Sequence, residues 1–195
     1  MVAGPSGSGK SDRFSVYDAG VDAFNVDDRC AELHHSYTGI PPAIREQAQK
    51  ECEEFVDEHI RTGKSFATET TLRTTVAIEQ AIRAKSAWFS TSIIYIGTGD
   101  VEINIERIRL RGLAGGHSAP AEAIRENYAR SLQNLPAALE AFDCADLYDN
   151  AGAEPRLALE VRNGHVKAVH GPLPRWVRET LAGTDLEQEL DPQAP

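Results

Sequence analysis

Two patterns of apolar and polar residues alternate along roughly the first 150 residues of the chain. Short apolar runs that end in polar residues are typical of buried strands, and apolar residues that recur every third or fourth position are typical of helices. The clearest helix begins at Pro41–Pro42, carries an apolar stripe that includes Cys52, and ends at Gly63. The same patterns predict further helices at 9–17, 75–85, 101–111 and from near Pro120, and strands at 23–26, 65–70, 91–99 and 145–152.

Strands and helices therefore alternate, which indicates a mostly parallel sheet covered by helices. The pattern changes after residue 152. Residues 156–171 alternate apolar and polar positions on either side of Asn163-Gly164, which predicts a β-hairpin. Residues 173–183 predict a short helix. We therefore expect a core at 1–152, an appended hairpin and helix at 153–185, and a flexible acidic tail at 186–195.

Composition and charge narrow the class of protein. A chain of 195 residues is long enough for one domain with a sizeable core. The formal charge of -10 argues against a nucleic-acid partner, which needs a basic face. The sequence has neither a membrane-spanning run nor the layout of a signal peptide, so we expect a cytoplasmic protein without a membrane partner. Cys30, Cys52 and Cys144 show no spacing of a disulfide framework or a zinc site, and Cys52 is expected to pack as a small apolar residue.

The segment GPSGSGKS near the start satisfies the pattern G-x-x-x-x-G-K-[ST]. Glycines let backbone N–H groups turn toward nucleotide phosphates, the lysine reaches the β and γ phosphates, and the serine hydroxyl is a ligand for Mg²⁺. A flexible glycine-rich start would not explain a lysine and a hydroxyl at the required positions. The predicted ligands of ATP (or GTP) in this loop are Gly4, Pro5, Ser6, Gly7, Ser8, Gly9, Lys10 and Ser11, with Ser11 also the predicted metal ligand.

This loop predicts the fold class: a three-layer P-loop NTPase fold with a mostly parallel, five-stranded sheet, plus the C-terminal hairpin and short helix. Only Met1–Ala3 precede the loop, where a strand of about five residues is usual, so we expect the natural chain to begin further upstream. The sequence lacks the N-K-x-D motif of switch GTPases and a clear Walker B strand. Small-molecule kinases are then the most economical class, and they need a carboxylate that activates the acceptor and arginines that cover the phosphates.

Three acidic or polar positions fit the acceptor side of such a site. Asp27 follows the second strand, at the sheet edge where ligands of open α/β folds bind, and is the candidate base for the acceptor hydroxyl. Asp28 is its rival, and helix capping is an alternative role for both. Glu69 and Thr70 end the third strand at the same edge and are candidate substrate contacts, although capping of the following helix would also explain Glu69.

Arginines gather around the glycine-rich segment GLAGGHSAP. Arg107 and Arg111 share one helix face before it, and Arg125 follows it. Two helices that carry arginines and meet at a flexible turn form a natural lid around 107–125, which would neutralise transition-state charge and exclude water. Arg111 and Arg125 are the candidate catalytic arginines, Arg107 is a candidate ATP ligand, and His117 is expected to act in lid closure or capping. A solvated charged face is the alternative.

Five segments in order, GPSGSGKS, FNVDD, FATETTL, RIRLRGLAGGHSAPAEAIRENYARSLQNL and LYDN, resemble the zeta-toxin-like P-loop kinases over residues 4–152. The resemblance implies an ATP- and Mg²⁺-dependent kinase. Characterised zeta toxins phosphorylate the 3'-hydroxyl of UDP-N-acetylglucosamine and are inhibited by an antitoxin. Matched residue by residue, Lys10 and Ser11 hold ATP and Mg²⁺, Asp27 is the base, Glu69 contacts the substrate, and the lid arginines bind the phosphates.

The GGH turn and the C-terminal LPRWV segment resemble stand-alone, non-toxin members more than toxins, so an antitoxin partner is not favoured. The predicted function is transfer of the γ-phosphoryl group from ATP to a hydroxyl of a small molecule, with a nucleotide sugar such as UDP-N-acetylglucosamine as one candidate acceptor. The alternatives are a nucleotide-dependent regulatory or binding ATPase, and the toxin component of a toxin–antitoxin pair.

Overall fold

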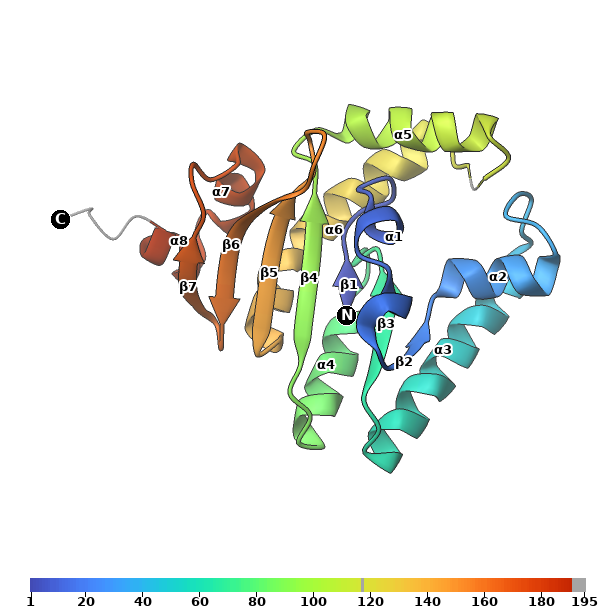
Figure 1. Ribbon diagram of the computed structural model, residues 1–195, viewed down its shortest axis with the longest axis horizontal. Coiled ribbons are helices and arrows are strands. Elements are labelled where there is room, and N and C mark those ends of the chain that lie inside the picture. The colour runs from blue at the N-terminus through green and yellow to red at the C-terminus, as the bar shows by residue number, and fades with distance from the viewer. Residues whose placement is uncertain (117, 191–195) are drawn as a thin grey trace.

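One seven-stranded sheet, in the order β2-β3-β1-β4-β5-β6-β7, forms the centre of the protein (Figure 1). The computed structural model describes residues 1–116 and 118–190. The first five strands are parallel to their neighbours, and β6 and β7 are antiparallel. The strands are β1 (Val2–Ala3), β2 (Asp22–Phe24), β3 (Phe66–Thr70), β4 (Ser92–Gly97), β5 (Cys144–Asp149), β6 (Arg156–Arg162) and β7 (His165–Val169).

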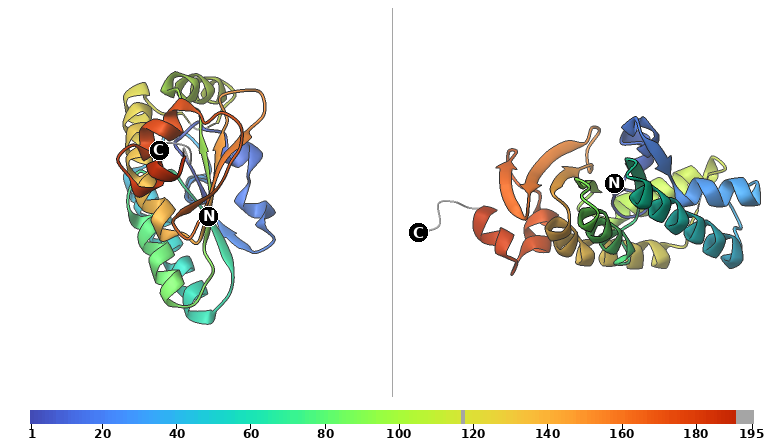
Figure 2. Two further views of the ribbon diagram at one scale, coloured as in Figure 1. Left: turned by 90° about the vertical axis from the view of Figure 1, so that its left-hand side faces the viewer. Right: turned by 90° about the horizontal axis from the view of Figure 1, so that it is seen from below.

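The predicted α/β class and the five parallel strands are confirmed, and the hairpin extends the same sheet instead of standing apart from it. Helices α3, α4, α6, α7 and α8 pack one against the next in a continuous layer on one face, and α1 and the 3₁₀-helix η1 lie on the other (Figure 2). The helices are α1 (Lys10–Arg13), η1 (Val16–Ala19), α2 (Val26–His34), α3 (Pro42–Thr62), α4 (Val76–Ser86), α5 (Val101–Leu113), α6 (Ala121–Ala141), α7 (Arg175–Leu181) and α8 (Asp185–Leu190).

Helix α3 forms as its sequence predicts. Pro42 opens it, and Gly63, in the left-handed conformation at φ 67°, ends it. Its buried residues include Ala48, Cys52 and Val56, which lie on the predicted stripe. Burial raises the pKa of the Cys52 thiol to about 11, as expected for a cysteine that packs as an apolar residue.

The helix expected at 9–17 is much shorter in the structure. Helix α1 ends at Arg13, because Phe14 leaves the helical conformation (φ -139°, ψ 62°). The ring of Phe14 packs instead against Tyr148 of β5, with the ring centroids 4.6 Å apart. A tertiary aromatic contact has therefore overridden the local helical periodicity.

The C-terminal segment is also more ordered than the sequence pattern indicated. Where a flexible tail was expected from residue 186, α8 buries Leu186 and Leu190 in the main hydrophobic core; 191–195 lie outside the described residues. Trp176 of α7 belongs to the same core, and its ring packs against Gly97 at the end of β4. A Cβ added to Gly97 would lie 2.6 Å from the ring. The C-terminal helices therefore support β4 close to the phosphate loop. The boundaries at 152 and 185 stay a prediction.

Candidate active site

The glycine-rich loop connects β1 to α1 and places Lys10 at the first position of that helix. Gly7 and Gly9 have φ of 78° and 93°, a backbone conformation that favours glycine. A Cβ at Gly7 would lie 2.6 Å from the carbonyl oxygen of Asn104, and a Cβ at Gly9 would lie 2.4 Å from Nδ2 of Asn150. The loop therefore needs glycine for its conformation and for its close packing, as the motif predicted.

Lys10, Ser11 and Glu69 meet at the carboxyl end of β3. The Ser11 hydroxyl donates to the Glu69 carboxylate at 3.0 Å, and Nζ of Lys10 lies 3.9 Å from Oε1 of Glu69. Burial lowers the pKa of Lys10, with the nearby charge of Glu69 opposing that shift, and burial raises the pKa of Glu69, with Lys10 opposing it. Each charge is thus only partly compensated by its partner, so an added phosphate group or cation would find an unsatisfied charge here.

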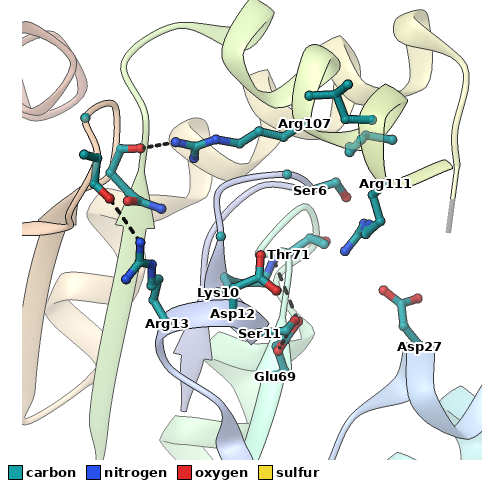
Figure 3. Close-up of a pocket in the computed structure, with 17 residues that line it drawn as sticks. Ser6, Lys10, Ser11, Asp12, Arg13, Asp27, Glu69, Thr71, Arg107 and Arg111 are labelled. Atoms are coloured by element: carbon teal, nitrogen blue, oxygen red, sulfur yellow. Dashed lines mark hydrogen bonds and ion pairs between the residues drawn. The ribbon is translucent and has the colours of Figure 1, made fainter. Parts of the chain in front are cut away.

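A cavity of about 390 Å³, which we call the phosphate cavity, lies over the loop (Figure 3). Its lining joins residues from five separate parts of the chain. Among them are Gly7, Gly9, Lys10, Ser11, Arg13, Asp27, Glu69, Arg107, Arg111 and Asn150.

A second cavity of about 760 Å³, the polar cleft, extends between α2, α3, α4 and the start of α6. Ser6, Asp27, Glu69 and Thr71 line both cavities, so these four residues mark the junction between them. Thr70 lines the polar cleft. The structure therefore brings the predicted acidic residues to one place, between the phosphate loop and a larger polar space.

The structure separates the roles of Asp27 and Asp28. Asn25, not either aspartate, caps α2, because its side-chain oxygen accepts from the backbone N–H groups of both. The Asp28 carboxylate accepts hydrogen bonds from the hydroxyls of Tyr17 and Tyr37, at 2.9 and 3.1 Å. Asp27 instead projects into the phosphate cavity opposite Arg111 (Figure 3). Asp27 is thus the aspartate placed to act on a ligand.

The three predicted arginines have three different environments. Arg111 lines the phosphate cavity, as predicted. Arg107 also lines it, but its guanidinium donates to the backbone oxygen of Asn150 at 2.8 Å and so supports the loop after β5. Arg125 lines neither cavity in this structure and forms an ion pair with Glu102 at the start of α5. The catalytic role of Arg125 stays a prediction. His117 lies outside the described residues.

Sequence reasoning missed a set of asparagines that fix the phosphate loop. Asn150 donates to the carbonyl oxygen of Ser8 at 2.7 Å, and Asn104 donates to that of Ser6, also at 2.7 Å. Asn127 accepts from the backbone N–H of Ser6. Only Asn150 carried a signal, because it closes the LYDN segment at the end of a strand. The other two are mid-helix polar residues, which sequence patterns do not distinguish from exposed ones.

The site fits a nucleotide and Mg²⁺ by the chemistry of its groups. The loop adopts positive φ at Gly7 and Gly9, protein atoms leave no room for a Cβ at either, and Lys10 is 6% exposed at its base. The Ser11 hydroxyl and the Glu69 carboxylate are the hard oxygen ligands that Mg²⁺ takes alongside phosphate oxygens. Among residues 1–116 and 118–190 there is no cluster of three or more His, Cys, Asp or Glu side chains that would hold a metal without phosphate. No helix in this part of the chain is long and apolar enough to span a membrane.

No protein-family model matches the sequence, and no curated protein matches it significantly. Solved structures do. A chain of the PezAT chromosomal toxin–antitoxin system of Streptococcus pneumoniae superposes with a TM-score of 0.59 at 20% identity, over 82% of this chain and 70% of that one. A chain of the AvrRxo1-ORF1:AvrRxo1-ORF2 complex with sulphate ions superposes with a TM-score of 0.63 at 14% identity, over 87% of this chain and 59% of that one. Both likenesses show that this chain shares its fold with these two proteins, as the sequence resemblance implied.

Proposed function

We propose that the protein is a kinase that transfers the γ-phosphoryl group of ATP to a hydroxyl of a small molecule. One observation carries the proposal: Asp27 and Glu69 line both the phosphate cavity and the polar cleft, so they lie where a phosphoryl donor would meet an acceptor. Phosphoryl transfer depends mainly on positioning and on charge stabilisation, and this junction supplies both.

The proposed role of Asp27 is that of the base. Its carboxylate faces the cavity from the second position of α2, and the Asn25 cap fixes the start of that helix. Arg45 lies 4.0 Å from Asp27 and lines the polar cleft. In the proposed reaction the oxygen of the acceptor hydroxyl bonds to the γ phosphorus and its proton passes to Asp27. The bond between the γ phosphorus and the β–γ bridging oxygen breaks, and ADP leaves.

Lys10, Ser11 and Arg111 are the proposed phosphate-side residues. Bound Mg²⁺ would neutralise phosphate charge, and Ser11, with Glu69 beside it, would hold it. Lys10 would contact the β and γ phosphates from the base of the loop. Arg111, which lines the same cavity, would stabilise charge on the transferring group.

Three cations, Arg45, Lys50 and Arg73, and three carboxylates, those of Asp27, Glu53 and Glu69, line the polar cleft. Its cations could pair with an anionic group of the acceptor while Asp27 faces the acceptor hydroxyl. A nucleotide sugar, which carries both a diphosphate and hydroxyls, is therefore the first acceptor class to test, with UDP-N-acetylglucosamine as its representative.

The test is to incubate the protein with γ-labelled ATP, Mg²⁺ and a panel of hydroxyl metabolites that includes nucleotide sugars, and to look for a labelled product. Asp27→Asn should bind ADP as tightly as the wild type but yield no product, whereas Asp28→Asn, the matched control, should still transfer. ATP binding without any labelled product would favour a regulatory ATPase. Full transfer by Asp27→Asn would remove Asp27 from its role.

A second candidate is the toxin of a toxin–antitoxin pair, because one structural neighbour comes from such a system. This candidate predicts growth arrest when the wild-type chain is expressed and normal growth when Lys10→Ala is expressed at the same level. Equal growth with both proteins would exclude it under those conditions.

A further inference from the structure

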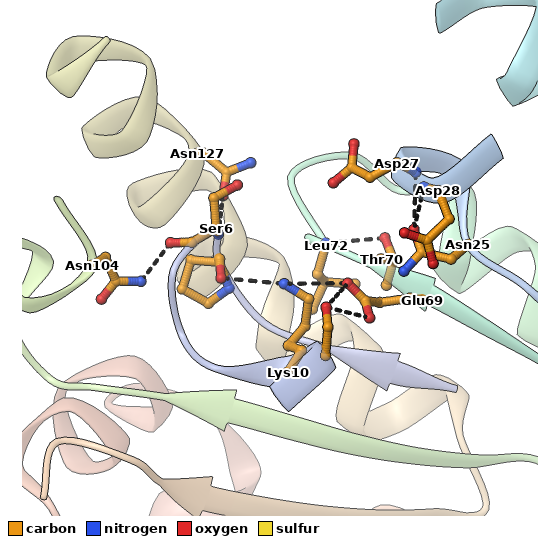
Figure 4. Close-up of polar contacts among 12 residues, drawn as sticks. Ser6, Lys10, Asn25, Asp27, Asp28, Glu69, Thr70, Leu72, Asn104 and Asn127 are labelled. Carbon is orange, nitrogen blue, oxygen red and sulfur yellow. Dashed lines mark hydrogen bonds and ion pairs between the residues drawn. The ribbon is translucent and has the colours of Figure 1, made fainter. Parts of the chain in front are cut away.

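Two asparagines hold the tip of the phosphate loop at Ser6, one on each side of the residue (Figure 4). Asn104 of α5 donates to the Ser6 carbonyl oxygen at 2.7 Å, and the Ser6 N–H donates to Oδ1 of Asn127 of α6 at 2.9 Å. Asn104 is fully buried, and its own oxygen accepts from Thr98, so both ends of its side chain bind protein. Its role is structural.

Asn127 differs from Asn104 because it lines the polar cleft. A carboxamide has an acceptor oxygen and an NH₂ group with two donors, and the bond to Ser6 uses only the oxygen. Figure 4 shows the amide nitrogen of Asn127 turned away from Ser6. The donor end of this side chain is therefore presented to the cleft side of the loop.

The position of Ser6 decides what that donor would meet. Gly7, Gly9, Lys10 and Ser11 line only the phosphate cavity, whereas Ser6 lines both cavities. A phosphate chain cradled by the loop would thus have its terminal group at the Ser6 end, because that group must reach an acceptor in the cleft. The NH₂ group of Asn127 lies beside the same residue.

We propose that Asn127 is a further nucleotide-contacting residue, whose oxygen anchors Ser6 and whose NH₂ group donates a hydrogen bond to the terminal phosphate of ATP. The inference rests on the proposed function, since it assumes that the loop binds a nucleoside triphosphate. Because ADP lacks the terminal phosphate, this contact favours ATP over ADP. A neutral donor at this point also leaves the charge of the transferring group to Lys10, Arg111 and the metal.

The test compares the affinities of Asn127→Ala for ADP and for the ATP analogue AMP-PNP, each with Mg²⁺, by titration calorimetry. Loss of a hydrogen bond to a charged group should weaken AMP-PNP binding by about tenfold or more, while ADP binding stays within about twofold. An equal loss for both nucleotides would overturn the proposed contact, because it would reflect a displaced loop. Unchanged binding of AMP-PNP would overturn it as well.

Two further variants distinguish loss of the proposed phosphate contact from loss of the loop's structure. Asn127→Asp keeps an oxygen for the Ser6 N–H but replaces the donor by a negative charge, so it should retain ADP and weaken AMP-PNP at least as much as Asn127→Ala. Normal AMP-PNP binding by Asn127→Asp would refute the donor role. Asn134→Ala is the matched control: it removes another α6 carboxamide, one that donates to the backbone oxygen of Leu72 at 3.0 Å, and should lower stability with an unchanged ratio of the two affinities.

Amide hydrogen exchange at Ser6 tests the anchor without any nucleotide. The Ser6 N–H should be protected in the wild type and in Asn127→Asp, and should exchange faster in Asn127→Ala. Rapid exchange in the wild type would overturn the anchor. If the wild type protects Ser6 yet binds neither nucleotide, the proposed function fails, and the phosphate contact fails with it, while the anchor stands.

Discussion

At Leu72, which is buried, we predict that substitution by glycine destabilises the protein no more than substitution by alanine. Leu72 follows β3 in the loop whose residues Thr71 and Arg73 line the polar cleft, and it is fully buried in the main core. Its φ is 56°, in the left-handed region that leucine rarely adopts. Its N–H donates to the Thr70 hydroxyl at 3.1 Å, which helps to hold this conformation.

The magnitudes follow from these two facts. Leu72→Ala removes a buried side chain and should cost about 2–5 kcal/mol. Glycine normally costs a further ~0.5–1 kcal/mol relative to alanine. In the left-handed region, however, glycine avoids a penalty of roughly 1–2 kcal/mol that alanine retains. Leu72→Gly should therefore be as stable as Leu72→Ala, or more stable by up to about 1.5 kcal/mol.

Urea unfolding of four variants measures this difference. Leu147, equally buried in β5 and outside the positive-φ residues, is the matched control. At that position glycine should be less stable than alanine by about 1 kcal/mol, as in an ordinary strand. If glycine gives a lower free energy of unfolding than alanine by the same amount at both positions, the left-handed conformation of Leu72 carries no strain and the reasoning is refuted.

Asp143→Asn should destabilise the protein at pH 7, because the carboxylate accepts from the Thr91 N–H and hydroxyl at 2.8 and 3.0 Å. These bonds hold the pKa of Asp143 below its ordinary value of 3.8, so the stabilisation is complete above pH 3.8 and is lost as the pH falls through the lower folded-state pKa. The urea unfolding curves of the wild type and Asp143→Asn should therefore converge at that low pH. A difference in stability that does not change with pH would contradict this role of the carboxylate. Gly97→Ala should lower Tm by several degrees, because its Cβ would lie 2.6 Å from the Trp176 ring, and an unchanged melt in near-UV circular dichroism would contradict the packing. Ser8→Ala should raise the free energy of unfolding by about 1 kcal/mol, because the buried Ser8 hydroxyl has no hydrogen-bond partner in the described part of the chain. A lower free energy of unfolding in Ser8→Ala would show that the hydroxyl does have a partner.

The sequence predicted the features of the site that depend on local backbone chemistry. Gly7 and Gly9 adopt positive φ, a requirement that glycine meets at low cost, so the spacing of the motif was informative. Strand ends were equally informative. Asp27 follows one predicted strand and Glu69 lies at the end of another, and parallel strands bring such residues to one edge.

Features that depend on partners distant in sequence were not predictable. Arg125 has the residue type and spacing of a phosphate ligand, but Glu102 on another helix pairs with it. Asn127 resembles any polar residue of an amphipathic helix until the fold brings α6 to the loop at Ser6, more than a hundred positions away. The choice between Asp27 and Asp28 also needed tertiary structure, because it rests on two tyrosine hydroxyls that donate to the Asp28 carboxylate.

The charges of the phosphate cavity explain how an acidic protein can accommodate a polyphosphate. Four cations and three carboxylates line this cavity, in a chain with a formal charge of -10. Arg13 pairs with Glu154 and Arg107 donates to backbone oxygens, which leaves Lys10 and Arg111 as the cations that would face the phosphates in the proposed reaction. Lys10 is partly countered by Glu69. Two such cations would not balance a nucleoside triphosphate, so under the proposed function Mg²⁺ would supply the positive charge that the side chains lack.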